Sequence, residues 1–265
     1  MAVITLLTDF GYQDEYIGVV KGVILDINPA ATIVDITHGI APQDVVAAAY
    51  TLKAAFKYFP RGTVHMVVVD PEVGSQRDIV ALKSDGHFFI APDNGLLGPV
   101  IADHGFEDGY LVENENLFRQ PVSRTFHGRD KFAPVAAHLS AGLPLKAVGR
   151  PMEMTQLRTL SISEPSMDHA GTLTGEVVRV DRFGNLITNI HSRHLAELQA
   201  EEMRTTVCGR AMNNLADRYI QGASGAPLAI LGSHDYLEIA VNGASAAELL
   251  KAERGEIVRV KAGIK

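Results

Sequence analysis

Apolar residues in the first half of the chain recur with two alternating spacings, which predicts alternating strands and helices. Short apolar, β-branched runs have the length of buried strands and cover residues 3–7, 32–36, 63–69, 79–83 and 87–91. Apolar positions at helical spacing predict helices over residues 15–27, 44–56 and 130–141, with Asp44 as an N-cap. The pair Asp85-Gly86 predicts a hairpin turn. This order is typical of a mostly parallel sheet with helices on both faces.

The second half of the chain lacks helical spacing and carries short strand-like runs instead. They cover residues 172–180, 186–190, 204–209, 227–231, 236–241 and 256–260. Closely spaced short strands predict an antiparallel β domain. We therefore expect an α/β domain over residues 1–165, with a central mostly parallel sheet, and a smaller C-terminal antiparallel β-barrel-like domain over residues 166–265.

Composition narrows the class of protein. The chain has 265 residues, of which 46% are hydrophobic and 21% charged, as in a packed globular protein. A net charge of −7 and the lack of a Lys/Arg cluster argue against a nucleic-acid partner. The longest apolar runs are only strand-length, so we expect no membrane span, and the first residues lead into a strand rather than a signal peptide.

A single cysteine, Cys208, excludes an internal disulfide framework and a zinc site built from cysteines. It lies in an apolar strand-like run, so we expect a buried, inert thiol. Together with the acidic composition, this cysteine usage favours a cytoplasmic protein.

Acidic residues followed by turn residues end several of the predicted strands. They are Asp9, Asp70, Asp93 and Asp181. Sheets of this class place their chemistry at strand ends. The alternative is structural, because Asp before Pro or Gly starts many turns and Asp9 could cap the following helix. The turn Asp93-Asn94-Gly95 is as well explained by turn chemistry alone.

A second polar segment, Thr125 to Asp130, enters a predicted helix and contains His127. His127 and Asp130 could suggest a metal site, but no known ligand spacing such as His-Glu-x-x-His is present. The chain also lacks a Gly-x-Ser-x-Gly nucleophile turn and a phosphate-binding loop. The residues by themselves therefore predict an α/β-plus-β enzyme with an acidic site built from loops.

Several motifs in order along the chain carry a resemblance to a known family. They are Thr8-Asp9-Phe10-Gly11, Val69-Asp70-Pro71 with Val73-Gly74 and Arg77, Phe126-His127-Gly128-Arg129-Asp130, Asp181 to Asn185 with Thr188-Asn189-Ile190, Gly232-Ser233, and Tyr236 to Asn242. The chain resembles the S-adenosylmethionine (SAM) hydroxide adenosyltransferases, relatives of the SAM-dependent fluorinase and chlorinase. The match covers essentially the whole chain, and the ordered set is specific although each motif alone is weak.

The resemblance implies hydrolysis of SAM by water attack at the ribose C5′ carbon, giving adenosine and L-methionine. It also implies a homotrimer in which SAM lies between the N-terminal domain of one subunit and the C-terminal domain of its neighbour. No cofactor or metal is expected, since SAM is the substrate.

The catalytic set implied by the resemblance is Asp70, Arg77 and His127. Asp70 and His127 would draw a proton from the attacking water, and Arg77 would orient the Asp70 carboxylate and keep it ionised. The halogenating relatives carry Tyr at the positions of Asp70 and His127, so these residue types favour water as the nucleophile. An incidental surface ion pair is the alternative explanation for Arg77.

The resemblance also assigns substrate-binding residues. Asp9 would hold the ribose hydroxyls, Asp14 and Asp181 the methionine ammonium, and Ser233 the carboxylate. Asn185 and backbone groups near Val241 would bind adenine, and Tyr219 would stack on it unless it is only a partly buried aromatic. Glu238 is also counted among the substrate-binding residues, and His234 stands where the fluorinase has Arg, which puts the carboxylate contact in question.

Three other functions remain open at this stage. A SAM-dependent halogenase is disfavoured by Asp70, His127 and Gly128, because a carboxylate repels a halide. A non-catalytic SAM or adenosine sensor would not need a water-activating set. A metal-dependent hydrolase built on the strand-end Asp residues would lose its activity with a chelator.

Overall fold

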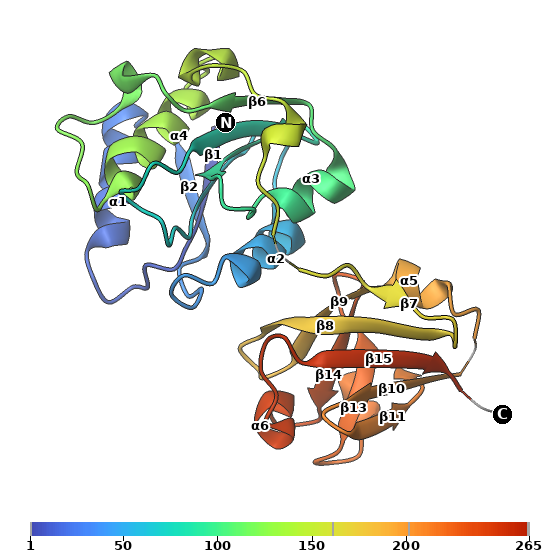
Figure 1. Ribbon diagram of the computed structural model, residues 1–265. Helices are drawn as coiled ribbons and strands as arrows, with labels where there is room; N and C mark the ends of the chain where they lie inside the picture. Colours follow the sequence, from blue (N-terminus) through green and yellow to red (C-terminus); the bar gives the residue numbers. More distant parts are fainter. Residues whose placement is uncertain (1, 161, 201, 264–265) are drawn as a thin grey trace. The chain divides into compact units, whose positions relative to one another are not determined.

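The computed structural model describes residues 2–160, 162–200 and 202–263 (Figure 1). The chain divides into two compact units, Met1–Leu160 and Ser161–Lys265. Each unit has a hydrophobic core of its own.

The N-terminal unit is built on a six-stranded mixed sheet of order β2-β1-β3-β5-β4-β6. Its strands are β1 (Val3–Thr8), β2 (Thr32–Thr37), β3 (Val64–Val68), β4 (Ile79–Ser84), β5 (His87–Pro92) and β6 (Asp108–Leu111). The four strands β2, β1, β3 and β5 run parallel, β4 pairs antiparallel to β5, and β6 pairs antiparallel to β4. The expected mostly parallel sheet is confirmed, and its parallel strands end at a shared edge.

Helices cover both faces of this sheet, and alternation along each strand decides which helices a side chain meets. Helices α1 (Tyr16–Ile27) and α4 (Ala133–Ser140) pack together on the face to which Ile4 and Leu6 point. Helices α2 (Val45–Ala55) and α3 (Gly98–His104) cover the face to which Leu7 points. Within the described ranges, none of the helices has the length and apolarity needed to cross a membrane.

Two local sequence signals act as predicted in this unit. The Asp44 side chain caps α2 by accepting a hydrogen bond from the Ala47 N–H at 3.0 Å. Asp85 and Gly86 both have positive φ, 44° and 73°, as a tight hairpin turn between β4 and β5 requires. Short 3₁₀ turns also lie in this unit, at Phe56–Tyr58, Glu115–Leu117, Leu145–Val148 and Met154–Gln156.

The C-terminal unit is a curled sheet of order β11-β10-β15-β8-β9-β14-β13-β12, with β7 beside β8. Its strands are β7 (Ser166–Met167), β8 (Thr172–Val180), β9 (Leu186–His191), β10 (Met203–Val207), β11 (Arg210–Asn213), β12 (Leu215–Ala216), β13 (Pro227–Leu231), β14 (Tyr236–Val241) and β15 (Ile257–Ala262). All of its neighbouring strands are antiparallel except β12 and β13. Because β11 also contacts β13, the sheet is a nearly closed barrel, as expected. Short helices α5 (Ser192–Ala196) and α6 (Ala246–Leu250) and a 3₁₀ turn, Tyr219–Gln221, lie in its connections.

The structure corrects two expectations and adds short elements that the sequence did not predict. The Cys208 thiol is exposed rather than buried, because the strand ends at Val207 and Cys208-Gly209 form the turn into β11, with φ of 47° and 70°. The helix predicted over residues 130–141 begins with a π-helical turn, Gly128–Phe132, and becomes α-helical at Ala133. The short elements α3 and β6 were not predicted, since seven and four residues carry too little periodicity.

Candidate active site

Asp70, Arg77 and His127 meet at the carboxyl edge of the N-terminal sheet. Asp70 follows β3, Arg77 precedes β4, and His127 precedes the π-helical turn. The Arg77 Nε–H donates to Asp70 Oδ1 and Oδ2 at 3.1 and 2.9 Å, and Nη2 also donates to Oδ2. Arg77 Nη2 lies 3.1 Å from His127 Nδ1 as well. One guanidinium therefore connects the carboxylate and the imidazole.

This ion pair is buried, not an incidental surface pair. The Arg77 side chain is 2% exposed and the Asp70 side chain 4%. The Phe132 ring lies under the guanidinium, with 5.6 Å from Arg77 Cζ to the ring centroid. Removing one partner of a buried pair leaves an uncompensated charge, which costs several kcal/mol. The geometry of Asp70 is therefore held by a strong constraint.

The contact with Arg77 also fixes the protonation of His127. A guanidinium can only donate, so His127 Nδ1 must accept, and the proton of the neutral ring sits on Nε2. Burial lowers the pKa of His127, and the positive charges of Lys131 and Arg77 lower it further. The imidazole is therefore neutral near pH 7 and carries an Nε2–H donor.

The π-helical turn after His127 is held by a buried carboxylate within its own segment. Asp130 is fully buried and accepts from Arg129 Nε and Nη2 at 2.7 and 2.8 Å and from the Ser123 N–H at 2.8 Å. This carboxylate is engaged by neighbours of its own segment. Among the described residues, no group of three or more His, Cys, Asp or Glu side chains is arranged to hold a metal ion.

A cavity of about 360 Å³ opens beside the Asp–Arg–His group. Its lining includes Asp9, Tyr16, Asp70, Phe126 and His127. The Asp9 carboxylate accepts from the Gln43 N–H at 2.7 Å and is partly exposed. Asp9 and Asp70 thus face one space, as expected for two residues at the ends of neighbouring strands. Asp14 is not brought to it: this residue lies exposed in the bend before α1.

A chain of side-chain contacts, from Thr8 through His38 and Asp35 to Lys21, adjoins the loop that carries Asp9. Thr8 Oγ1 lies 2.8 Å from His38 Nδ1 and accepts from the Phe10 N–H at 3.2 Å. His38 Nε2 lies 3.1 Å from Asp35, whose carboxylate also binds Lys21 at 2.7 Å. Burial lowers the pKa of His38. The sequence pattern gave no sign of His38, which is a histidine at the end of a strand without a motif around it.

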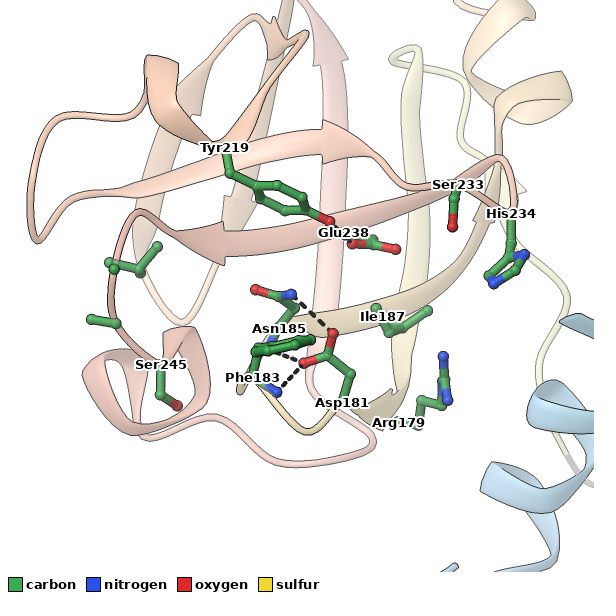
Figure 2. A pocket seen from close by; sticks show the side chains of 13 residues that line it. Arg179, Asp181, Phe183, Asn185, Ile187, Tyr219, Ser233, His234, Glu238 and Ser245 are labelled. Carbon is green, nitrogen blue, oxygen red and sulfur yellow. Dashed lines mark hydrogen bonds between the residues drawn. The ribbon is translucent and has the colours of Figure 1, made fainter. Parts of the chain in front are cut away.

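The C-terminal unit has a cavity of its own, of about 700 Å³ (Figure 2). The predicted binding residues of this unit all line it: Asp181, Asn185, Tyr219, Ser233, Glu238 and Val241. They come from the β8–β9 loop, the 3₁₀ turn, the β13–β14 turn and β14. Arg179, Phe183 and His234 also line the cavity. Of these, Arg179 had no place in the sequence-based set, because nothing in its strand pattern separates it from an ordinary surface residue.

Asp181 and Asn185 form a closed polar loop in this cavity. Asp181 Oδ1 accepts from the backbone N–H groups of Phe183 and Asn185 at 2.8 and 2.9 Å, and Oδ2 accepts from Asn185 Nδ2 at 2.9 Å. The Asn185 amide is thereby oriented with its oxygen left as an acceptor. Gly184, at φ 82°, allows this close turn, since an added Cβ would lie 2.1 Å from Ser245 Oγ.

Tyr219 and Glu238 form the second polar pair of the cavity. The Tyr219 hydroxyl donates to Glu238 Oε2 at 2.9 Å (Figure 2). Burial raises the pKa of Tyr219 to about 12, with the Glu238 hydrogen bond adding to the effect, and burial also raises the pKa of Glu238. Gly232 lets the carboxylate lie against its backbone, because an added Cβ would lie 1.8 Å from Glu238 Oε1.

An α/β unit with a buried Asp–Arg–His group and a β-barrel-like unit with a large cavity that holds two polar pairs together define a two-unit enzyme. The SAM hydroxide adenosyltransferase N-terminal domain model matches residues 4–149, and the C-terminal domain model of the same family matches residues 175–259. The chain therefore belongs to the SAM hydroxide adenosyltransferase family.

Relatives with assigned names align over nearly their whole length. The chain is 36% identical to an (R)-S-adenosyl-L-methionine hydrolase of Thermus thermophilus, with 98% of this chain and 100% of that protein covered. It is 32% identical to a fluorinase of Nocardia brasiliensis, with coverages of 98% and 97%. The crystal structure of an uncharacterized conserved protein from Thermotoga maritima superposes with a TM-score of 0.90 at 38% identity and coverages of 97% and 99%.

Proposed function

We propose that this protein is an S-adenosyl-L-methionine hydrolase, which transfers the adenosyl group to water and yields adenosine and L-methionine. Family membership and the similarity to named hydrolases over 98% of the chain support the activity. The structural observation that most directly supports this activity is the buried Arg77, which binds both Asp70 and His127 beside a cavity.

The proposed reaction is a single displacement at the ribose C5′ carbon. A water oxygen forms the new bond to C5′ while the C5′–S bond breaks, and methionine departs as a neutral thioether that needs no proton. The proton released by the water must be accepted by the protein. Asp70 is the proposed acceptor, because the Arg77 contact makes His127 Nδ1 an acceptor already in use and leaves Nε2–H as a donor.

His127 would then orient the water rather than take its proton. The Nε2–H group donates to the water oxygen and fixes its position, while the carboxylate of Asp70 accepts from it. Holding nucleophile and carbon in line lowers the barrier by several kcal/mol. Arg77 holds Asp70 and His127 in place relative to each other through its hydrogen bonds to both.

The binding roles form part of the same proposal. Asp9 would accept from the ribose hydroxyls. In the C-terminal cavity, the Asn185 amide oxygen, the backbone near Val241 and the Tyr219 ring would bind adenine, and Asp181, Ser233 and Glu238 would complete the contacts. The oriented Asn185 amide supports its assignment. Asp181 already accepts three bonds from its loop, so we assign it chiefly to holding Asn185.

We further propose a homotrimer in the cytoplasm that needs no cofactor. Exposed apolar side chains of the C-terminal unit support burial in an assembly: Phe183, which lines the cavity, is 79% exposed, and Ile220, which follows Tyr219 in the chain, is 78% exposed. A single cysteine and an acidic composition support the location. Light scattering of the purified protein checks the assembly, and a mass of one chain would contradict it.

The decisive test of the reaction is incubation with SAM in ¹⁸O-labelled water, without chloride and with a chelator, followed by mass spectrometry. We expect adenosine with one ¹⁸O at the 5′ position and unlabelled methionine. Loss of turnover with the chelator would contradict the metal-free mechanism, and turnover only on addition of halide would identify a halogenase. Bound but unconverted SAM would identify a sensor.

The catalytic assignment needs a separate variant. Asp70→Ala should lower kcat at least about a hundredfold, the range of loss typical when a general base is removed. Full hydrolysis by this variant would overturn the role of Asp70 while leaving the SAM hydrolase activity in place.

A further inference from the structure

The turn Asp93-Asn94-Gly95 hydrogen-bonds both ends of the segment that carries Asp70 and Arg77. The Asn94 side-chain amide donates from Nδ2 to the Val69 carbonyl, directly before Asp70, at 2.9 Å. The Asp93 backbone N–H donates to the Asp78 carbonyl, directly after Arg77, at 3.0 Å. One tripeptide thus hydrogen-bonds to the chain directly before Asp70 and directly after Arg77, on either side of the loop of residues 71–76.

The loop needs such support because its own residues are exposed to solvent. Residues 71–76 are all exposed, whereas the side chains of Asp70 and Arg77 at its two ends are buried. Within the loop, Gly74 at φ 83° packs against the Arg124 carbonyl, which an added Cβ would approach to 2.4 Å. The positions of the two buried side chains are therefore set mainly at the ends of the loop.

The turn Asp93-Asn94-Gly95 is itself held by hydrogen bonds and backbone contacts, so it can hold the chain next to Asp70 in place. Asn94 Oδ1 accepts from the Leu96 N–H at 3.3 Å, and the buried Asp93 carboxylate accepts from the Arg158 N–H at 3.0 Å. Gly95, at φ 92°, lies against the backbone of Thr159 and Leu160, which an added Cβ would approach to 2.7 Å. The segment 158–160 thus contacts the turn at both Asp93 and Gly95.

We propose that Asn94 is a positioning residue for hydrolysis, which acts by fixing the backbone from which Asp70 projects. The proposal rests on the proposed function, in which Asp70 accepts the proton of the attacking water. Asn94 lines neither cavity, so we assign it no contact with substrate. Its loss should misplace the base without weakening SAM binding.

The chain offers a matched control in Asn114. Its Nδ2 donates to the Ala147 carbonyl at 2.9 Å and its Oδ1 accepts from the Asn116 N–H at 3.2 Å, the same two bonds that Asn94 makes. Like Asn94, Asn114 lines neither cavity. Equal substitutions at the two positions remove equal bonds, so only a positioning role should separate them in kcat.

The experiment compares Asn94→Ser and Asn94→Ala with Asn114→Ser and Asn114→Ala by steady-state kinetics with SAM. The Ser side chain can still accept from the Leu96 N–H but is too short to reach the Val69 carbonyl. Asn94→Ser therefore keeps the hydrogen bond within the turn and loses the one to Val69. We expect kcat to fall about tenfold or more in both Asn94 variants with KM nearly unchanged, as for a small misplacement of a reacting group. Both Asn114 variants should retain kcat.

A second comparison separates this proposal from the proposed function. In an Asp70→Ala background, Asn94→Ser should cause no further fall in kcat, because the group it positions is gone. An equal additional fall would overturn the positioning role, and so would an unchanged kcat in folded Asn94→Ser. If Asp70→Ala itself hydrolyses SAM fully, the assignment of Asp70 fails first, and that result is seen without any Asn94 variant.

Discussion

Arg77 is the residue on which the chemistry of the N-terminal cavity depends. It contacts a carboxylate seven positions earlier and an imidazole fifty positions later. Because guanidinium groups only donate, this one side chain determines which histidine nitrogen holds the proton. A Lys at position 77 could not make the planar two-point contact with Asp70, so the choice of Arg has a physical reason.

The protonation of His127 gives a prediction at the residue scale. Burial and the neighbouring positive charges lower the pKa of His127, so the neutral form that Arg77 requires persists below pH 6.5. We expect kcat to stay level as pH falls from about 8 through 6.5 and to decline only at lower pH, where the protonated ring repels Arg77. The measurement is the pH profile of single-turnover hydrolysis.

The control for this profile is His127→Gln, which keeps an N–H donor near the Nε2 position but cannot titrate. The rate of hydrolysis by His127→Gln should begin to decline at a lower pH than that of the unmodified protein. A midpoint at or above 6.5 in the unmodified protein, absent from His127→Gln, would contradict the neutral His127 assignment.

Sequence alone could not bring these residues together. The strand-end pattern singled out Asp9 and Asp70 as candidate site residues, and the structure places both on the lining of one cavity. The meeting of Arg77 with His127 depends on a π-helical turn whose geometry no periodicity encodes. The resemblance to a family supplied the set, and the roles of its members stay predictions until the variants are measured.

At the scale of elements, strands of the C-terminal unit were the most predictable. The ranges of β8, β13 and β14 match the sequence-based ranges residue for residue. Elements held by tertiary contacts instead of pattern escaped prediction, as α3 and β6 did. The Cys208 error has the same origin, because the apolar run hides a turn that depends on two left-handed residues.

The loop between β8 and β9 gives a prediction at this scale. Gly184 has φ 82° and would place a Cβ 2.1 Å from Ser245 Oγ, whereas Gly171 has φ 71° with no atom within 4 Å of an added Cβ. Gly171→Ala should lower the free energy of unfolding by about 1 kcal/mol from backbone strain alone. Gly184→Ala should lower it by about 2–4 kcal/mol, because overpacking adds to the strain.

Denaturant unfolding measures both losses, and SAM binding gives a second readout. Gly184→Ala should weaken SAM binding, since the shifted loop reorients Asn185, and Gly171→Ala should leave binding unchanged. Equal effects of the two variants on both quantities would show that the contact with Ser245 has no influence on this loop.

At the scale of the whole molecule, buried histidines couple stability to pH. His65 is fully buried, with Nδ1 2.7 Å from Thr5 Oγ1 and Nε2 3.1 Å from His87 Nδ1, among the rings of Phe56 and Phe89. Burial, together with the smaller effect of neighbouring His87, lowers the pKa of His65 to about 3. The folded protein therefore keeps this ring neutral at a pH where the unfolded chain is protonated.

The sign of the effect follows from proton binding. Above pH 6.5 neither state is protonated at His65 and it adds no pH dependence. Between 6.5 and about 3, only the unfolded state takes the proton, so stability falls as pH falls, by up to about 1.4 kcal/mol per pH unit. Denaturant unfolding at several pH values should show this slope.

His65→Gln removes the titrating ring and should flatten the slope, whatever its effect on stability at pH 7. His169→Gln, at an exposed position, is the control and should leave the slope unchanged. A slope that persists in full in His65→Gln would assign the effect to other groups.

The exposed turn at Cys208 has a practical consequence for experiments on the intact protein. It provides one thiol per chain, on a hairpin tip that lines neither cavity. Partial burial and the nearby Glu256 carboxylate raise the pKa of this thiol, so a maleimide dye should couple more readily in mildly alkaline buffer. Each chain would then carry a single fluorophore without any engineered cysteine, and the bleaching steps of one particle would count its subunits directly.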